Sequence, residues 1–273
     1  MKARYRYRFY PTIEQKNFLA QLFGCTRVVW NDALAQCKSL GKALNYNKLS
    51  SQLTQAKQTE DRKWLKDVSS VPLQQSLKNL SQAYKNFFNS VQGKRKGKKL
   101  RPPKFKKRHN KQAATFTKAG FQVKGSKVYL AKIGDISPVW SRELPSVPSS
   151  VTVIKDSAER YFLSFVVEIN PKKLPDNGKS TGIDLGITDF ATLSNGEKIK
   201  APKPLKEKLK RLRKLQRNLA RKTKGSRRRD KARKRVAKLY AKVKDTRDDF
   251  LHKLSTKIIR ENQTIVLEDL NVS

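Results

Sequence analysis

Two acidic residues, Asp184 and Glu268, stand in or directly after apolar runs of the kind that form buried strands. Asp184 interrupts the run at 182–187, and Glu268 follows Ile265, Val266 and Leu267. An ionised carboxylate in apolar surroundings is costly unless a cation or hydrogen bonds compensate for it. A pair of carboxylates can hold Mg²⁺ while substrate phosphates complete the coordination shell. Two such ions about 4 Å apart can stabilise the attacking and leaving oxygens of phosphodiester cleavage.

The elements around these acids predict that the two carboxylates meet at one end of a small sheet. A strand around Asp184 is followed by a hairpin that turns at Asn195-Gly196, by a long basic helical stretch, and by the strand TIVLEDL. A helical crossover requires the first and last of these strands to lie side by side and parallel. The order therefore predicts an RNase H-like arrangement in which Asp184 and Glu268 are catalytic residues and Mg²⁺ ligands. Either motif alone is a weak signal, and we interpret Asp189 and Asp269 as structural.

The net charge limits the classes of partner. The 273-residue chain has 63 lysines and arginines against 22 acidic residues, which gives a formal net charge of +41. Nucleic acid is the obvious counter-charge, because each cation that neutralises a phosphate releases condensed counterions. A membrane partner is not expected, since no run approaches the length of an apolar span or provides an anchor for a surface helix. Charge alone distinguishes neither RNA from DNA nor an enzyme from a binding protein.

The N-terminus and the cysteines point to a reducing, cytoplasmic setting. MKARYRYRFYP carries charge but lacks the apolar centre of a secretory signal. Cys25 and Cys37 are too few for a disulfide framework or a zinc site of their own.

The first two thirds of the chain predict a β-domain that is interrupted by helices. Arg4, Arg6 and Arg8 alternate with aromatic residues on a first strand. Helical patterns follow at about 12–23, 26–39, 49–57 and 73–91, and Gly24 is expected to separate the first two. Short strands then occupy 113–169, and the first strand could pair with them.

Two basic segments are candidate nucleic-acid contacts. A loop over 93–108 has glycine and proline among its cations and carries no acid, although a solvated linker is the alternative. Phe105 favours contact, since an aromatic ring can stack on a base. The other segment is a helical hairpin over 203–261, broken at Gly225-Ser226. We expect contacts to the nucleic-acid backbone from Arg4, Lys104, Lys106, Lys107, Arg108, Arg211, Arg213, Arg217, Arg221, Arg227 and Arg228.

Over its whole length the chain resembles TnpB, the OrfB-type family of bacterial insertion sequences, which is related to type V CRISPR effectors. The resemblance lies in YRFYPT, GCTRVVWN, LQQSLKNLSQAYKNFF, PKFKKR, GIDLGITDFA, RLRKLQRNLARKTKGS, RDDFLHKLSTKII and VLEDL. It implies an RNA-guided endonuclease that holds a guide RNA from the transposon end and cuts double-stranded target DNA with a Mg²⁺-dependent RuvC domain. Asp184 and Glu268 match the first two RuvC carboxylates. Positions that read a short motif beside the target are matched by Tyr46, Ser50, Gln74 and Thr117.

The resemblance also implies a domain order. The expected fold is α+β and multidomain: a wedge-type β-barrel with an inserted helical recognition bundle, followed by an incomplete RNase H-like (RuvC) α/β domain. The expected boundaries are 1–10 for the first wedge strand, 11–92 for the recognition helices, 93–172 for the rest of the barrel, and 179–273 for the partial nuclease domain. The expected location is the bacterial cytoplasm, in association with the nucleoid.

Family members continue beyond the motifs found in this sequence. In the family the RuvC domain goes on to a zinc ribbon and a third catalytic Asp, so zinc is expected only in that missing part. With one carboxylate fewer, metal binding should weaken and cleavage should largely fail. Two alternatives stay open, namely a nuclease-inactive RNA-guided DNA-binding or regulatory protein, and a generic RNA-binding protein. The sequence determines neither the oligomeric state nor the guide RNA.

Overall fold

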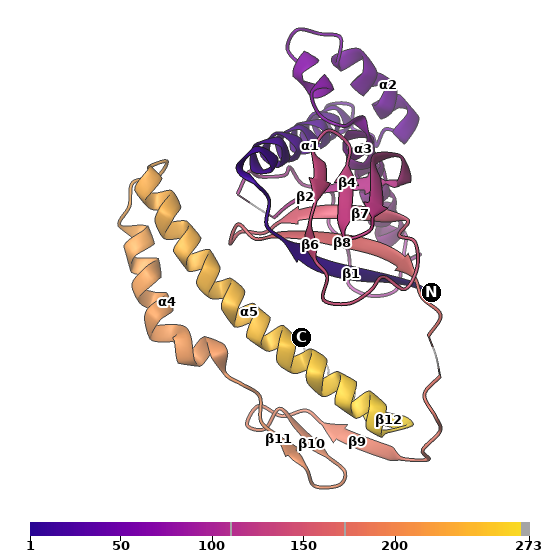
Figure 1. Cartoon of the computed structure of the whole chain (residues 1–273), viewed down its shortest axis with the longest axis vertical. Coiled ribbons are helices and arrows are strands. Elements are labelled where there is room, and N and C mark those ends of the chain that lie inside the picture. Colours follow the sequence, from indigo (N-terminus) through magenta and orange to yellow (C-terminus); the bar gives the residue numbers. More distant parts are fainter. Residues whose placement is uncertain (110, 172, 269–273) are drawn as a thin grey trace. The chain divides into compact units, whose positions relative to one another are not determined.

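A computed structural model describes residues 1–109, 111–171 and 173–268 of the chain. The chain divides into two compact units, Met1–Asn170 and Pro171–Ser273. The described residues form five α-helices and three β-sheets, so the fold is a mixed α and β architecture (Figure 1). No helix within these ranges is both long enough and apolar enough to cross a membrane.

A five-stranded antiparallel sheet lies at the centre of the first unit. Its order is β2-β7-β8-β1-β6, with β1 at Lys2–Phe9, β2 at Gln112–Thr117, β6 at Pro138–Val139, β7 at Ser150–Lys155 and β8 at Tyr161–Glu168. The first strand pairs along its whole length with β8, from Lys2 opposite Glu168 to Phe9 opposite Tyr161. The predicted pairing of the first strand with the later strands is therefore confirmed. A second sheet comprises β3 (Phe121–Lys124), β4 (Lys127–Leu130) and β5 (Gly134–Ile136).

Three helices lie between β1 and β2 in the chain, which makes them an insertion into the sheet. They are α1 (Ile13–Ser39), α2 (Tyr46–Ala56) and α3 (Ser70–Val91), with a short 3₁₀ turn, η1, at Lys63–Lys66. The expected break at Gly24 is wrong, because α1 continues through it for 27 residues. Buried residues on both sides, including Phe23 and Cys25, hold the helix against its neighbours. This burial outweighs the roughly 1 kcal/mol that one glycine costs a helix.

One hydrophobic core joins these helices to one face of the five-stranded sheet. Side chains alternate along β1, so Tyr7 and Phe9 enter the core and are 1% and 0% exposed. Phe165 of β8 packs edge-on against Tyr7, with ring centres 5.8 Å apart. The arginines of β1 lie on the opposite face of the sheet.

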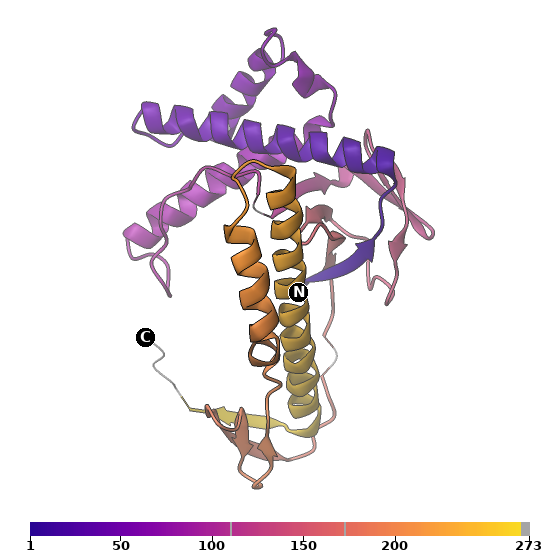
Figure 2. The ribbon, with the colours of Figure 1, turned by 90° about the vertical axis from the view of Figure 1, so that its left-hand side faces the viewer.

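The second unit combines a four-stranded sheet with a helical hairpin. The sheet order is β11-β10-β9-β12, with β9 at Ser180–Asp184, β10 at Ala191–Leu193, β11 at Lys198–Ile199 and β12 at Thr264–Leu267. Between β11 and β12, α4 (Pro204–Ala220) and α5 (Arg227–Glu261) pack side by side in opposite directions (Figure 2). Leu212, Val236 and Leu239 are buried between them. The predicted strand order and the predicted hairpin are both confirmed.

Alanine substitutions at two glycines should change the stability of the first unit in opposite directions. A Cβ at Gly24 would meet nothing within 4 Å, so Gly24→Ala should stabilise α1 by roughly 0.5–1 kcal/mol. Gly120 ends η2, a 3₁₀ turn at Lys118–Gly120, and a Cβ there would lie 3.0 Å from Phe116 Cδ1 and 3.2 Å from Val71 Cβ. Gly120→Ala should destabilise the first unit by about 1–3 kcal/mol. Thermal unfolding of the two variants measures both effects, and shifts of the same sign would contradict the packing described.

Candidate nuclease site and nucleic-acid interface

Asp184 and Glu268 come to the same end of the second unit's sheet. β9 and β12 are parallel, with Val266 opposite Gly182 and Leu267 opposite Ile183. Glu268 follows Leu267 just as Asp184 follows Ile183, so the two acids continue the same register. Both residues are exposed, and β9 ends at Asp184. The expectation that Asp184 interrupts an apolar strand is therefore wrong, and burial gives no argument about the charge of its carboxylate.

Two exposed carboxylates on neighbouring strand ends fit a hard cation. Paired strands lie about 4.8 Å apart, so two acids in register can share one oxygen-ligated ion, and that ion would offset their mutual repulsion. Asp189, interpreted as structural, is partly buried in the loop after β9. Asp269 lies outside the described residues. Within the described ranges no set of three or more acidic, histidine or cysteine side chains gathers in a metal-binding arrangement.

The basic segment 93–108 is fastened to α1 by two neighbouring side chains. Asn31 brackets the main chain of Lys106: its Oδ1 accepts from the Lys106 amide at 2.8 Å, and its Nδ2 donates to the Lys106 carbonyl at 3.1 Å. The indole Nε1 of Trp30 donates to the carbonyl of Lys104 at 3.1 Å. These bonds use only the main chain of the segment, which leaves the lysine side chains for other contacts. A freely solvated linker does not describe this part of the segment.

Two aromatic rings, one on α1 and one in the basic segment, each hold a lysine ammonium group where the segment meets α1. Lys106 Nζ lies 3.9 Å from the centre of the Trp30 ring, and Lys38 Nζ lies 4.7 Å from the centre of the Phe105 ring. Desolvation of its ammonium group lowers the pKa of Lys106 to about 8, although the residue as a whole is exposed. A phosphate beside this ammonium would favour the charged form and raise its pKa again. Trp30 and Asn31 were not predicted as functional residues, and the only signal for them is the VWN stretch within GCTRVVWN.

All the residues predicted to contact the nucleic-acid backbone are exposed. They lie on β1 (Arg4), in the basic segment (Lys104, Lys106, Lys107, Arg108), on α4 and its C-cap (Arg211, Arg213, Arg217, Arg221) and on the first turn of α5 (Arg227, Arg228). The neighbouring Arg229 has a structural role, since its guanidinium donates to the carbonyls of Leu219 and Lys222 at 3.1 and 2.7 Å and closes the turn between the helices.

The four residues predicted to read a DNA motif lie on α2, α3 and β2. Tyr46 begins α2, and the ammonium of Lys78 on α3 lies 5.0 Å from the centre of its ring. Ser50 is one turn further along α2, and Gln74 is exposed one turn before Lys78. Thr117 ends β2, the strand that packs against α3. Gln74 and Lys78 are one turn apart on α3, and α3 packs against both α2 and β2.

Two family profiles match the chain. A profile described as "Probable transposase", of the OrfB proteins of IS605-type insertion sequences, matches residues 164–273. A second profile of the same proteins, described as "Helix-turn-helix domain", matches residues 1–43, which the structure describes as β1 followed by the uninterrupted α1. Together with the relatives below, these matches show that the chain belongs to the OrfB (TnpB-type) family.

The curated relatives carry more specific names. A protein of Streptomyces pristinaespiralis named "Putative RNA-guided DNA endonuclease" is 42% identical over 280 residues, which cover 100% of this chain and 68% of the relative. "Putative RNA-guided DNA endonuclease InsQ" of Escherichia coli (strain K12) is 32% identical over 98% of this chain and 66% of its own length. The chain thus spans about two thirds of the length of these relatives. A solved structure titled "Cryo-EM structure of CRISPR-Cas12f Ternary Complex" matches 93% of this chain and 63% of that chain at 13% identity, with a TM-score of 0.38.

The bracket between Asn31 and Lys106 predicts a local protection from hydrogen exchange. Asn31→Ala removes one hydrogen bond to the Lys106 amide and one to its carbonyl, each worth about 0.5–1.5 kcal/mol. The Lys106 amide should therefore exchange roughly tenfold faster or more, as measured by hydrogen–deuterium exchange. Asn79→Ala, which removes a side-chain contact with Gln75 on α3, is the matched control and should leave this amide unchanged. Equal exchange in both variants would contradict the bracket.

Proposed function

We propose that this chain is the guide-binding and DNA-binding part of a TnpB-type RNA-guided endonuclease, with Asp184 and Glu268 as ligands of Mg²⁺. The observation that supports the proposal is the parallel register of β9 and β12, which pairs Ile183 with Leu267, the residues directly before Asp184 and Glu268. The names of the curated relatives support the same activity. The net charge of +41 supports a polyanionic partner.

In this proposal the first unit recognises the nucleic acid and the second unit contains the cleavage site. The unit Met1–Asn170 corresponds to a wedge-type barrel (1–10 and 93–172) that carries the recognition helices (11–92). The unit Pro171–Ser273 contains the RuvC-type part, at 179–273. The basic segment and the helical hairpin hold the guide RNA and the guide–target heteroduplex through backbone contacts, while base pairing supplies sequence specificity. The target-adjacent motif in double-stranded DNA is read by Tyr46, Ser50, Gln74 and Thr117.

The protein side chains contribute to the reaction by positioning the metal ion and by neutralising the charge of the nucleic-acid strand. Asp184 and Glu268 fix the cation and supply the negative charge that retains it. The cations of α4, in the same unit as the carboxylates, hold the phosphodiester strand against repulsion from Asp184 and Glu268. Mg²⁺ held by Asp184 and Glu268 would activate a water molecule and stabilise the charge that develops on the phosphate oxygens.

A second candidate function is RNA-guided DNA binding without cleavage. It needs the same nucleic-acid contacts and the same net charge of +41 as the first function, but no metal site. Cleavage of guide-matched DNA by the purified chain distinguishes the two functions.

Substitution of the carboxylates tests the metal site separately from nucleic-acid binding. Asp184→Ala and Glu268→Ala should each weaken Mn²⁺ binding by about tenfold or more in calorimetric titration, since each removes a charged ligand. RNA affinity should stay within a few-fold of wild type, and any guide-dependent cleavage should be abolished. Asp189→Ala serves as the control on the same loop and should retain the cation. Loss of RNA binding in Asp184→Ala would count against this assignment.

The lowered pKa of Lys106 predicts a pH dependence of RNA binding. The free ammonium titrates at a pKa of about 8, and a bound phosphate raises that pKa, so RNA binding takes up a proton. Affinity should therefore fall several-fold as the pH rises from about 7 to about 9. Lys106→Arg keeps its charge over this range and should show a flatter profile in fluorescence anisotropy. Identical profiles for both proteins would place Lys106 outside the RNA contact.

A further inference from the structure

The face of the five-stranded sheet that points away from the core carries a row of arginines. Arg4, Arg6 and Arg8 alternate with core residues on β1, so they share this face at intervals of about 6.6 Å. Arg4 and Arg6 are exposed and Arg8 is partly buried. This spacing resembles that of successive phosphates along an extended nucleic-acid strand.

Three guanidinium groups surround one aromatic ring on this face. The Cζ atoms of Arg6, Arg8 and Arg160 lie 4.9, 5.1 and 5.4 Å from the centre of the Phe162 ring. Phe162 of β8 stands directly opposite Arg8 of β1. A guanidinium held over a ring has lost much of its side-chain freedom, while its edge can still donate hydrogen bonds. The ring therefore preorganises a cluster of cations, which we call the Phe162 cluster (Arg6, Arg8, Arg160 and Phe162).

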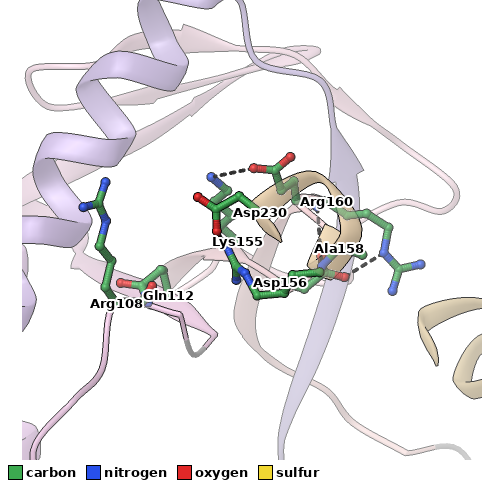
Figure 3. Close-up of polar contacts among 9 residues, drawn as sticks. Arg108, Gln112, Lys155, Asp156, Ala158, Arg160 and Asp230 are labelled. Atoms are coloured by element: carbon green, nitrogen blue, oxygen red, sulfur yellow. Dashed lines mark hydrogen bonds and ion pairs between the residues drawn. The ribbon is translucent and has the colours of Figure 1, made fainter. Parts of the chain in front are cut away.

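Within the Phe162 cluster, Arg160 has a carboxylate partner, whereas Arg6 and Arg8 have none among the described residues. Arg160 Nε donates to Asp156 Oδ2 at 2.7 Å, and Asp156 Oδ1 accepts from the backbone amides of Ala158 and Arg160 (Figure 3). Among the described residues, no carboxylate pairs with Arg6 or Arg8, and Arg8 Nε is buried without a hydrogen-bond partner. Like charges this close repel one another, so an anionic ligand would stabilise the cluster.

A row of hydroxyl groups crosses the same face beside the cluster. The register sets Arg6 opposite Ser164, Ser164 opposite Thr152, and Thr152 opposite Thr115. Ser164 is only 6% exposed, so the hydroxyls of this row that a ligand can reach are those of Thr115 and Thr152, which are partly exposed. The hydroxyls of Thr115 and Thr152 lie 3.0 Å apart. Hydroxyl groups can both donate and accept hydrogen bonds, so they suit the ribose 2′-hydroxyl, which DNA lacks. The arginines can bind phosphates, and the neighbouring hydroxyl groups can contact riboses. This combination favours an RNA strand.

We propose that the Phe162 cluster binds the phosphate backbone of an RNA strand, with the adjoining hydroxyl row in contact with its riboses. The inference rests on the proposed function, since it adds a contact for the guide RNA. The site lies wholly on β1, β7 and β8, the short turn that leads into β8, and β2. None of its residues belongs to the basic segment or to the helical hairpin, and of the arginine row on β1 only Arg4 was predicted from the sequence as a backbone contact.

The test compares salt-dependent affinities for a labelled single-stranded RNA of mixed sequence and for DNA of the same sequence. Arg6→Ala with Arg8→Ala should weaken RNA binding by about tenfold or more. It should also lower the slope of log affinity against log salt by about 1.4, from about 0.7 per phosphate contact on a single strand. Lys16→Ala with Lys127→Ala removes the same charge from exposed positions elsewhere in the first unit and should change RNA affinity less than threefold.

Two further variants separate charge from geometry. Arg6→Lys with Arg8→Lys keeps the charge, so it should retain the salt slope and still lose several-fold in affinity. Phe162→Leu should also lose several-fold, with an unchanged melting temperature confirming that the sheet has folded. If Arg6→Ala with Arg8→Ala binds RNA as tightly as Lys16→Ala with Lys127→Ala, the proposal is wrong. The arginines would then only shield Phe162 from solvent. An equal loss for RNA and DNA would overturn the choice of RNA. Wild-type protein that binds no RNA at all would instead refute the proposed function.

Discussion

The parallel pairing of β9 with β12 is the constraint on which the candidate nuclease site depends. Two parallel neighbours cannot be joined by a tight turn, so the chain must travel back along the sheet between them. Here it does so through the hairpin of α4 and α5, and α5 alone has 35 residues and a length of about 52 Å. The long basic helices and the two carboxylates are therefore parts of one arrangement. The crossover that brings Asp184 and Glu268 together also presents a cationic surface.

Throughout the described residues, cations are positioned by rings and amides as well as by carboxylates. Lys106 lies on Trp30, Arg6 and Arg8 of β1 surround Phe162 together with Arg160, and Asn31 holds the main chain of the basic segment. A carboxylate in these places would fix the cation equally well, but it would also cancel the charge. An aromatic ring restricts the side chain and leaves its charge available for a phosphate. With 22 acidic residues for 63 cations, most of the surface charge has to remain uncancelled in any case.

The sequence predicted the features that follow from local patterns and chain order. Alternation on β1 separated the arginines from Tyr7 and Phe9, and the strand order of the second unit followed from the crossover rule. The break at Gly24 failed because tertiary burial outweighed a local propensity. The bracket on Lys106 and the Phe162 cluster were missed because they join residues far apart in sequence, as with Asn31 and Lys106, and no local periodicity encodes such contacts. The domain names, the metal ligands and the motif-reading residues remain predictions.

The place of β1 in its sheet has a consequence for how the protein is made. Lys2 pairs with Glu168, so β1 leaves the ribosome well before β8, the strand with which it pairs. The entropic cost of closing a loop rises only with the logarithm of its length. The long separation between β1 and β8 therefore reduces the stability of the finished sheet only a little. Pairing over such a sequence separation is slow, however, whereas α1 to α3 can form from local contacts. We therefore expect the helices to be folded before the sheet that they interrupt is complete, while β1 still exposes its aromatic face.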